Sequence, residues 1–130
     1  MQLTIIKLER FSHQDYIDLS KIWPEYNLSS LKAGIYAARF NERLLGAVRV
    51  TLCDDEGILD SFRIRKITRQ RGIGRYLLEE VLADNPGINN WWMTDVGVEN
   101  RTVMTAFMQT LNFTAYQNGW VKRLTKSAST

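Results

Sequence analysis

The feature that most constrains this chain is a short stretch at residues 69–74 with the sequence Arg-Gln-Arg-Gly-Ile-Gly. An apolar, strand-like run (58–64) precedes it, and an amphipathic, helix-like run (75–83) follows it. A tight turn between a strand and a helix start directs backbone N–H groups and the positive end of the helix dipole toward one point. Gly72 and Gly74 allow a ligand to approach closely, and Arg69, Arg71 and Arg75 add positive charge. We therefore expect a diphosphate-binding loop, with a solvated surface turn as the alternative.

Other phosphate-binding loops match this stretch less well. A Rossmann fold would need Gly-x-Gly-x-x-Gly and a later ribose-binding acid, and a nucleotide P-loop would end in Gly-Lys-Ser or Gly-Lys-Thr. The pattern Arg-x-x-Gly-x-Gly at Arg69, Gly72 and Gly74 resembles the acyl-CoA pyrophosphate loop of the GCN5-related N-acetyltransferase (GNAT) fold. Two departures from that pattern are Lys66-Ile67, where the fold commonly has Pro-Glu or Pro-Asp, and Gln70, where it usually has a glycine.

Length and composition predict one soluble domain at residues 1–122, followed by a frayed tail at 123–130. No run reaches membrane-spanning length and the N-terminus shows no signal-peptide pattern, so we expect a cytoplasmic protein. A single cysteine (Cys53) and a single histidine (His13) offer neither an internal disulfide nor a metal cluster. The net charge is +3, and six basic residues lie within residues 63–75. This clustering favours a local polyanionic ligand over a broad nucleic-acid surface.

The hydrophobic pattern predicts an α/β protein with a mixed sheet in the order βα(α)βββαβαβ. Strands are expected at 3–8, 35–40, 44–52, 58–64, 90–94 and 113–121, with a polar hairpin tip at 41–43 and an acidic turn at 53–57. A first helix should begin at Ser12, because Asp15 completes a capping box, and should stop before Pro24. Further helices are expected at 29–32, at 75–83, and from 99–101 onward with Val103, Ala106, Phe107 and Leu111 on its apolar face.

The GNAT resemblance implies that the chain is a single acetyltransferase-like domain that binds acetyl-CoA or CoA. The pantetheine arm would lie along the fourth strand, the phosphates would lie at the glycine loop, and the start of the last helix would contact the far side of the cofactor. The implied cofactor-binding residues are Phe62, Arg63, Ile64, Thr68, Arg69, Gln70, Arg71, Gly72, Ile73, Gly74, Arg75, Glu99, Asn100, Arg101 and Thr102.

The groups needed for acetyl transfer are poorly represented. Such an enzyme needs a base to deprotonate its amine acceptor and usually a tyrosine to protonate the leaving thiolate. The tyrosine position falls on Phe107 or Met108, neither of which can donate a proton, and the candidate bases are Glu56 and Asp60. An active N-acetyltransferase therefore remains an alternative to a non-catalytic acetyl-CoA-binding protein, so no catalytic residue is assigned.

Four longer segments narrow the resemblance. Residues 22–26, 35–45, 91–93 and 103–109 resemble the PanZ family, although the linker before Ile35 looks shorter than in that family. Members bind acetyl-CoA, promote the autoproteolytic cleavage that forms the pyruvoyl group of the aspartate 1-decarboxylase precursor, and restrain the mature enzyme. The resemblance thus implies a regulator of pantothenate and CoA biosynthesis that is a monomer on its own. Its expected partner is the decarboxylase, through exposed residues of the hairpin and of the loop start: Arg39, Asn41, Glu42, Arg43, Arg65 and Lys66.

Overall fold

The computed structural model describes residues 3–25, 34–65, 72–96 and 98–123. They form one seven-stranded mixed sheet in the order β1-β2-β3-β4-β5-β7-β6, in which only β4 and β5 run parallel. This confirms the predicted α/β fold with a mixed sheet. The strands are β1 (Thr4–Leu8), β2 (Ile35–Phe40), β3 (Arg43–Cys53), β4 (Glu56–Ile64), β5 (Asn90–Thr94), β6 (Thr114–Tyr116) and β7 (Gly119–Arg123). The helices are α1 (His13–Ile22), α2 (Ile73–Asp84) and α3 (Arg101–Thr110).

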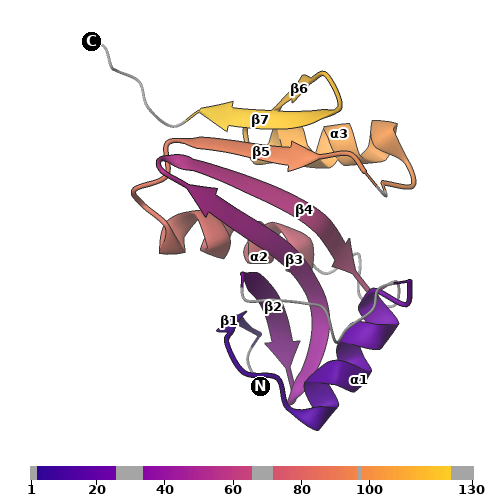
Figure 1. Cartoon of the computed structure of the whole chain (residues 1–130). Coiled ribbons are helices and arrows are strands. Elements are labelled where there is room, and N and C mark those ends of the chain that lie inside the picture. The colour runs from indigo at the N-terminus through magenta and orange to yellow at the C-terminus, as the bar shows by residue number, and fades with distance from the viewer. Residues whose placement is uncertain (1–2, 26–33, 66–71, 97, 124–130) are drawn as a thin grey trace.

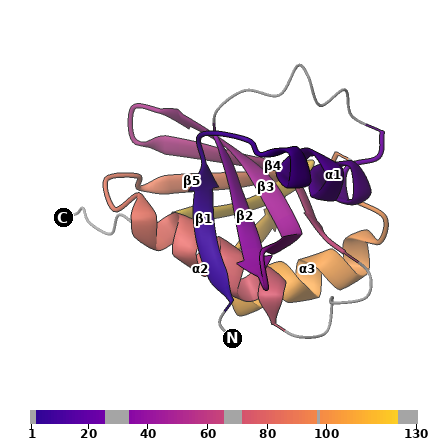
Figure 2. The ribbon, with the colours of Figure 1, turned by 90° about the horizontal axis from the view of Figure 1, so that it is seen from below.

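The helices cover the two faces of the sheet unequally (Figures 1 and 2). α1 packs over β1–β3 on one face, where Leu19 and Trp23 are fully buried. α2 and α3 cover the other face and contribute Leu77, Leu78 and Met108 to the larger core. The part of the first face over β4, β5 and β7 carries no helix in the views of the described chain, and it is the more open side of the molecule.

The start of α1 follows the predicted capping box. The Ser12 hydroxyl accepts a hydrogen bond from the Asp15 N–H at 3.0 Å, and the Asp15 carboxylate accepts one from the Ser12 N–H at 3.0 Å. Two otherwise unsatisfied N–H groups are thereby paired, which fixes where the helix begins. The helix ends at Ile22, before Pro24, as predicted. The short helix expected at 29–32 lies outside the described residues.

Three turns differ from the predictions. The tip of the β2–β3 hairpin is a two-residue turn, because Asn41 and Glu42 both adopt positive φ (52° and 69°) and Arg43 already belongs to β3. β4 begins at Glu56, so this residue lies in a strand and not in the acidic turn. The single last strand predicted at 113–121 is wrong: the chain reverses at Gln117 (φ 51°) and forms the β6–β7 hairpin.

The predicted apolar face of α3 is wrong in part. Val103 is 63% exposed and Ala106 is also exposed, whereas Met108 is fully buried. The side chains that meet the core are Met104, Phe107, Met108 and Leu111. The paired tryptophans of β5 divide as expected for neighbouring strand residues, with Trp91 buried in the core and Trp92 partly exposed on the open face. In the described part of the chain, no helix is long and apolar enough to span a bilayer.

Candidate functional site

The parallel strands β4 and β5 part at their C-terminal ends. Their register runs from Glu56 and Asn90 to Leu59 and Met93 and extends no further among the described residues, and Figure 1 shows the two strands diverging beyond this point. On its other side β4 pairs with β3 as far as Ile64. The C-terminal half of β4 therefore borders a gap in the strand pairing, where backbone amides can take an extended, amide-containing ligand.

A β-bulge lies at the point where β4 leaves β5. The β3–β4 register passes from Arg49–Asp60 to Ala47–Arg63, so β4 has one more residue than β3 in this interval, and Ser61 has φ 59°. Bulges bend a strand and redirect its side chains. Here the bulge immediately precedes Phe62.

The start of α2 has no side-chain cap. Gly72 is the N-cap residue, has φ 72°, and offers no side chain to cap the helix, and the first turn contains no acidic residue. A Cβ at Gly72 would meet no atom of the described residues within 4 Å, so these residues leave the space beside this backbone open. A Cβ at Gly74 would lie 2.9 Å from Phe62 Cζ, so this glycine lets α2 pack closely against β4. Uncapped N–H groups and the helix dipole then face open space, which fits a phosphate group.

The predicted cofactor residues that the structure describes lie at one end of the sheet. Phe62, Arg63 and Ile64 form the end of β4, the described residues of the glycine loop begin α2, and residues 99–102 begin α3, which follows β5. Because β4 and β5 are parallel, both helix starts lie at the same edge of the sheet (Figure 1). Four predicted cofactor residues and one predicted partner residue lie outside the described residues: Thr68, Arg69, Gln70, Arg71 and Lys66.

The side chains at the start of α3 make local contacts that the sequence analysis missed. The Asn100 side chain caps α3 by accepting a hydrogen bond from the Val103 N–H at 3.0 Å. Arg101 pairs with Asp95 at 2.8 Å and lies over the Trp120 ring at 4.9 Å. These contacts fix the helix start beside the end of β5. The Arg101 guanidinium is therefore held in one position by the protein itself.

The region expected to hold a proton donor is apolar. The Phe107 ring stacks on the Phe62 ring with centroids 5.9 Å apart and an interplanar angle of 9°, and Met108 is fully buried. Of the two candidate bases, Glu56 lies at the start of β4, far along the strand from the glycine loop. Asp60 is closer to that loop, and its carboxylate accepts a hydrogen bond from Ser61 Oγ at 2.8 Å and lies 3.7 Å from Arg49.

Both arginines of the predicted partner hairpin are held by α1. Arg43 donates from Nε and Nη2 to Asp18 Oδ1 at 2.9 and 2.7 Å, and Leu44 N–H donates to Asp18 Oδ2 at 2.9 Å. Burial alone would raise the pKa of Asp18, but the hydrogen bonds from Arg43 and Leu44, with that from Gln14, lower it overall. Arg39 Nη2 donates to Asp15 Oδ1 at 3.0 Å.

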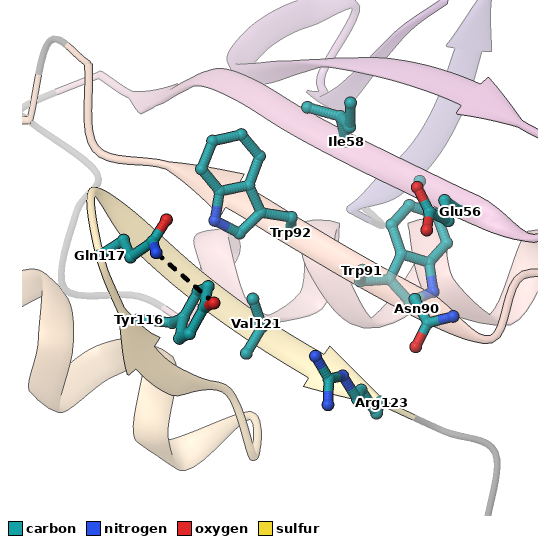
Figure 3. Close-up of a pocket in the computed structure, with 10 residues that line it drawn as sticks. Glu56, Ile58, Asn90, Trp91, Trp92, Tyr116, Gln117, Val121 and Arg123 are labelled. Atoms are coloured by element: carbon teal, nitrogen blue, oxygen red, sulfur yellow. Dashed lines mark hydrogen bonds between the residues drawn. The ribbon is translucent and has the colours of Figure 1, made fainter.

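A surface pocket of about 640 Å³ lies on the open face of the sheet, away from the glycine loop (Figure 3). The aromatic and aliphatic side chains that line the pocket, including Trp92 and Tyr116, belong to strands β4 to β7. One end of the pocket is lined by Glu56 at the start of β4, Asn90 at the start of β5 and Arg123 at the end of β7. None of the predicted cofactor residues lines it. This pocket and the predicted anion site are therefore different places.

Comparisons with known proteins agree with this fold. A family model described as an acetyltransferase (GNAT) domain, PanZ, matches residues 2–121. The PanD regulatory factor of Escherichia coli (strain K12) is 68% identical over 126 residues, which cover 94% of this chain and 99% of that protein. The PanD regulatory factor of Salmonella typhimurium (strain LT2) is 65% identical over 127 residues, covering 95% of this chain and all of that protein. The solution structure of a putative N-acetyltransferase, YhhK of Escherichia coli, bound to coenzyme A, superimposes with a TM-score of 0.86 at 66% identity; the match covers 95% of this chain and 99% of that one.

Proposed function

Since the chain belongs to the PanZ family of GNAT domains, we propose that it is an acetyl-CoA-binding regulator of aspartate 1-decarboxylase. With acetyl-CoA bound, it docks on the decarboxylase precursor and promotes the autoproteolytic cleavage that forms the pyruvoyl group. It then restrains the mature enzyme, so that pantothenate and CoA synthesis fall when acetyl-CoA is plentiful. It acts in the cytoplasm and is a monomer without its partner.

The observation that carries the proposal is the parting of β4 and β5 beside the uncapped start of α2. In the proposed complex the pantetheine amides follow the backbone of Phe62, Arg63 and Ile64, and the pyrophosphate lies at Gly72, Ile73, Gly74 and Arg75. The similar Escherichia coli protein was solved with coenzyme A bound. Cofactor contacts by residues 68–71 and 99–102 are part of the same proposal.

The apolar Phe107–Phe62 stack and the buried Met108 favour a regulator over an enzyme, because neither Phe107 nor Met108 can protonate a leaving thiolate. The partner surface in this proposal is the β2–β3 hairpin with Arg39, Asn41, Glu42 and Arg43, extended by Arg65 and Lys66. The ion pairs to α1 hold this hairpin in one orientation, and a preformed surface loses less conformational entropy on docking.

The direct test is to incubate purified decarboxylase precursor with this protein, with and without acetyl-CoA, and to follow chain cleavage by intact mass while assaying free thiol. We expect cleavage to accelerate only when both are present, without thiol release. The alternative function is acetyl transfer to an amine, for which Asp60 beside the β4 bulge is the candidate base. Thiol release that depends on an added amine, without cleavage, would establish that alternative.

The phosphate site can be tested with a matched pair of substitutions at Gly72. Gly72→Asp places a negative charge where the pyrophosphate is proposed to lie, and Gly72→Asn adds a side chain of the same shape without the charge. Both residues tolerate positive φ better than most, so the pair differs mainly in charge. We expect acetyl-CoA affinity, measured by calorimetry, to fall much further for Gly72→Asp. Equal affinities in the two variants would remove the phosphate from this position.

The hairpin can be tested at Asn41 in a similar way. Asn41→Gly removes the side chain and keeps the positive φ of the turn, whereas Asn41→Ala also strains the backbone. We expect both variants to bind acetyl-CoA normally and to bind the decarboxylase more weakly. If Asn41→Gly binds the decarboxylase as the unmodified protein does, the Asn41 side chain is not part of the interface.

A further inference from the structure

Helix α1 connects the two surfaces of the proposed function. Figure 1 shows that its N-terminal end lies beside the β2–β3 turn and its C-terminal end beside the end of β4. We propose that α1 couples acetyl-CoA binding at β4 to the β2–β3 hairpin, with Asp18, Trp23 and Glu25 as positioning residues. The inference rests on the proposed function, because it concerns how one ligand changes the affinity for the other.

The contacts at the hairpin end are strong. The buried Asp18 carboxylate accepts hydrogen bonds from both the Arg43 guanidinium and the Leu44 N–H. A carboxylate that accepts from a guanidinium and a backbone amide fixes both groups with more direction than an isolated ion pair. A displacement of α1 therefore has to move the start of β3, or these charge-assisted hydrogen bonds are lost.

The hairpin end also contains an unsatisfied donor. Arg39 Nε is buried and has no acceptor among the described residues, although Nη2 of the same side chain pairs with Asp15. A buried donor without an acceptor is uncommon in folded proteins. Asp15 belongs to α1, so the same helix also sets where the Arg39 guanidinium lies.

The contacts at the other end reach the proposed pantetheine strand. Trp23, the C-cap residue of α1, donates from Nε1 to the Ser61 carbonyl at 2.7 Å. Arg63 donates from Nη1 to the Ile22 carbonyl at 3.2 Å and pairs with Glu25 at 2.9 Å. The hydrogen bond from Arg63 lowers the pKa of Glu25, so the pair stays ionised at neutral pH.

The β4 bulge gives the ligand a means of moving α1. Ser61 has positive φ at the bulge, and its carbonyl is the group that Trp23 holds. A ligand that hydrogen-bonds to Phe62 and its neighbours fixes the bulge geometry and, with it, the direction of the Ser61 carbonyl. α1 has 10 residues and, at about 1.5 Å per residue, is a single rigid rod between this carbonyl and the Asp18 site.

The test uses the protein with acetyl-CoA alone and reads the Leu44 amide, which donates to Asp18. We expect acetyl-CoA to slow hydrogen exchange of this amide, measured by NMR, about fivefold or more. The slowing should disappear in Trp23→Phe/Glu25→Gln, which keeps β4 and the hairpin unchanged. Glu25→Gln alone, at an exposed site, should reduce it without threatening the fold. Lys21→Gln is the matched control, because it removes a charge from the same exposed turn and should leave the slowing intact.

The second readout is the coupling factor, obtained from acetyl-CoA affinity with and without the decarboxylase precursor. We expect it to fall toward one in Trp23→Phe/Glu25→Gln and to stay unchanged in Lys21→Gln. Precursor cleavage that depends on acetyl-CoA would support the proposed function. If the Leu44 amide then does not respond to acetyl-CoA, or if the double variant keeps the coupling factor, this inference is overturned while the proposed function stands. Absence of acetyl-CoA binding by the unmodified protein would overturn both.

Discussion

Replacing Asp18 with asparagine tests whether the α1 carboxylate holds the hairpin. Asp18 is fully buried and accepts hydrogen bonds from Arg43, Leu44 N–H and Gln14. Asparagine keeps the shape and one acceptor oxygen, so it can satisfy the Leu44 N–H, but it loses the charge and places an NH₂ group against a guanidinium. Hydrogen bonds to charged groups contribute about 1.5–3 kcal/mol each. Because the Arg43 side chain is 40% exposed and can return to water, we expect Asp18→Asn to cost about 1–2 kcal/mol.

Asp18→Ala should cost more, about 3 kcal/mol, because the Leu44 N–H then also loses its acceptor. The assay is urea unfolding followed by tryptophan fluorescence at pH 7, with Glu80→Gln on the exposed surface of α2 as control. That substitution makes the same carboxylate-to-amide change and should stay within about 0.5 kcal/mol of the unmodified protein.

The pH dependence gives an independent check on Asp18. The pKa of Asp18 is lowered in the folded protein, so its stabilising contribution is fully present above the unfolded pKa of about 4 and is lost as the pH falls through the folded pKa. The difference in unfolding free energy between the unmodified protein and Asp18→Asn should therefore shrink below about pH 4. A difference below 0.5 kcal/mol at pH 7, which is about the noise level for surface changes, or a difference that does not change with pH, would refute the reasoning.

Three further substitutions probe the rest of the sheet by urea unfolding. Gly119→Ala should cost about 2–4 kcal/mol, because its Cβ would collide with the Met93 carbonyl across the β5–β7 pair. Thr105→Val should cost about 1–2 kcal/mol, since it removes the acceptor of the buried Trp120 indole N–H. Tyr36→Phe should cost about 1 kcal/mol at pH 7. Burial and a neighbouring carboxylate raise the pKa of Tyr36 in the folded state. The contribution of the Tyr36 hydroxyl to the unfolding free energy is therefore present below the unfolded pKa of about 10 and is lost as the pH rises through the folded pKa.

Features encoded by local interactions could be predicted from the sequence. The Ser12–Asp15 capping box fixed the start of α1 correctly, because both hydrogen bonds join residues three positions apart. The strand, glycine turn and helix around Gly72 were also predicted, because an apolar run, the glycines and an amphipathic run follow one another directly in the sequence. These two patterns gave the helix starts on which the candidate site depends.

Features set by contacts between distant segments could not be predicted. The turn at Gln117 lacks the Asn-Gly or Asp-Gly pair in the central positions that marks a tight hairpin, so β6 and β7 were merged into one strand. The amphipathic pattern of α3 does not reveal that Val103 is exposed, because exposure depends on how the helix packs against the rest of the fold. The contacts of Arg101 with Asp95 and Trp120 could not be predicted either, because the fold brings these partners to it.

The contacts of α1 limit how strongly acetyl-CoA can control docking through this helix. At the β4 end the contacts described above are the Trp23–Ser61 and Arg63–Ile22 hydrogen bonds, contributing about 0.5–1.5 kcal/mol each, and the Arg63–Glu25 pair, which is half-exposed and contributes about 0–1 kcal/mol. A ligand can shift an equilibrium only by the difference in free energy that it makes between the two states. The coupling through these contacts is therefore at most about 4 kcal/mol, or roughly 700-fold in affinity. A measured coupling factor well above this value would mean that acetyl-CoA also acts through contacts other than those of α1, with the loop that precedes α2 as the next segment to test.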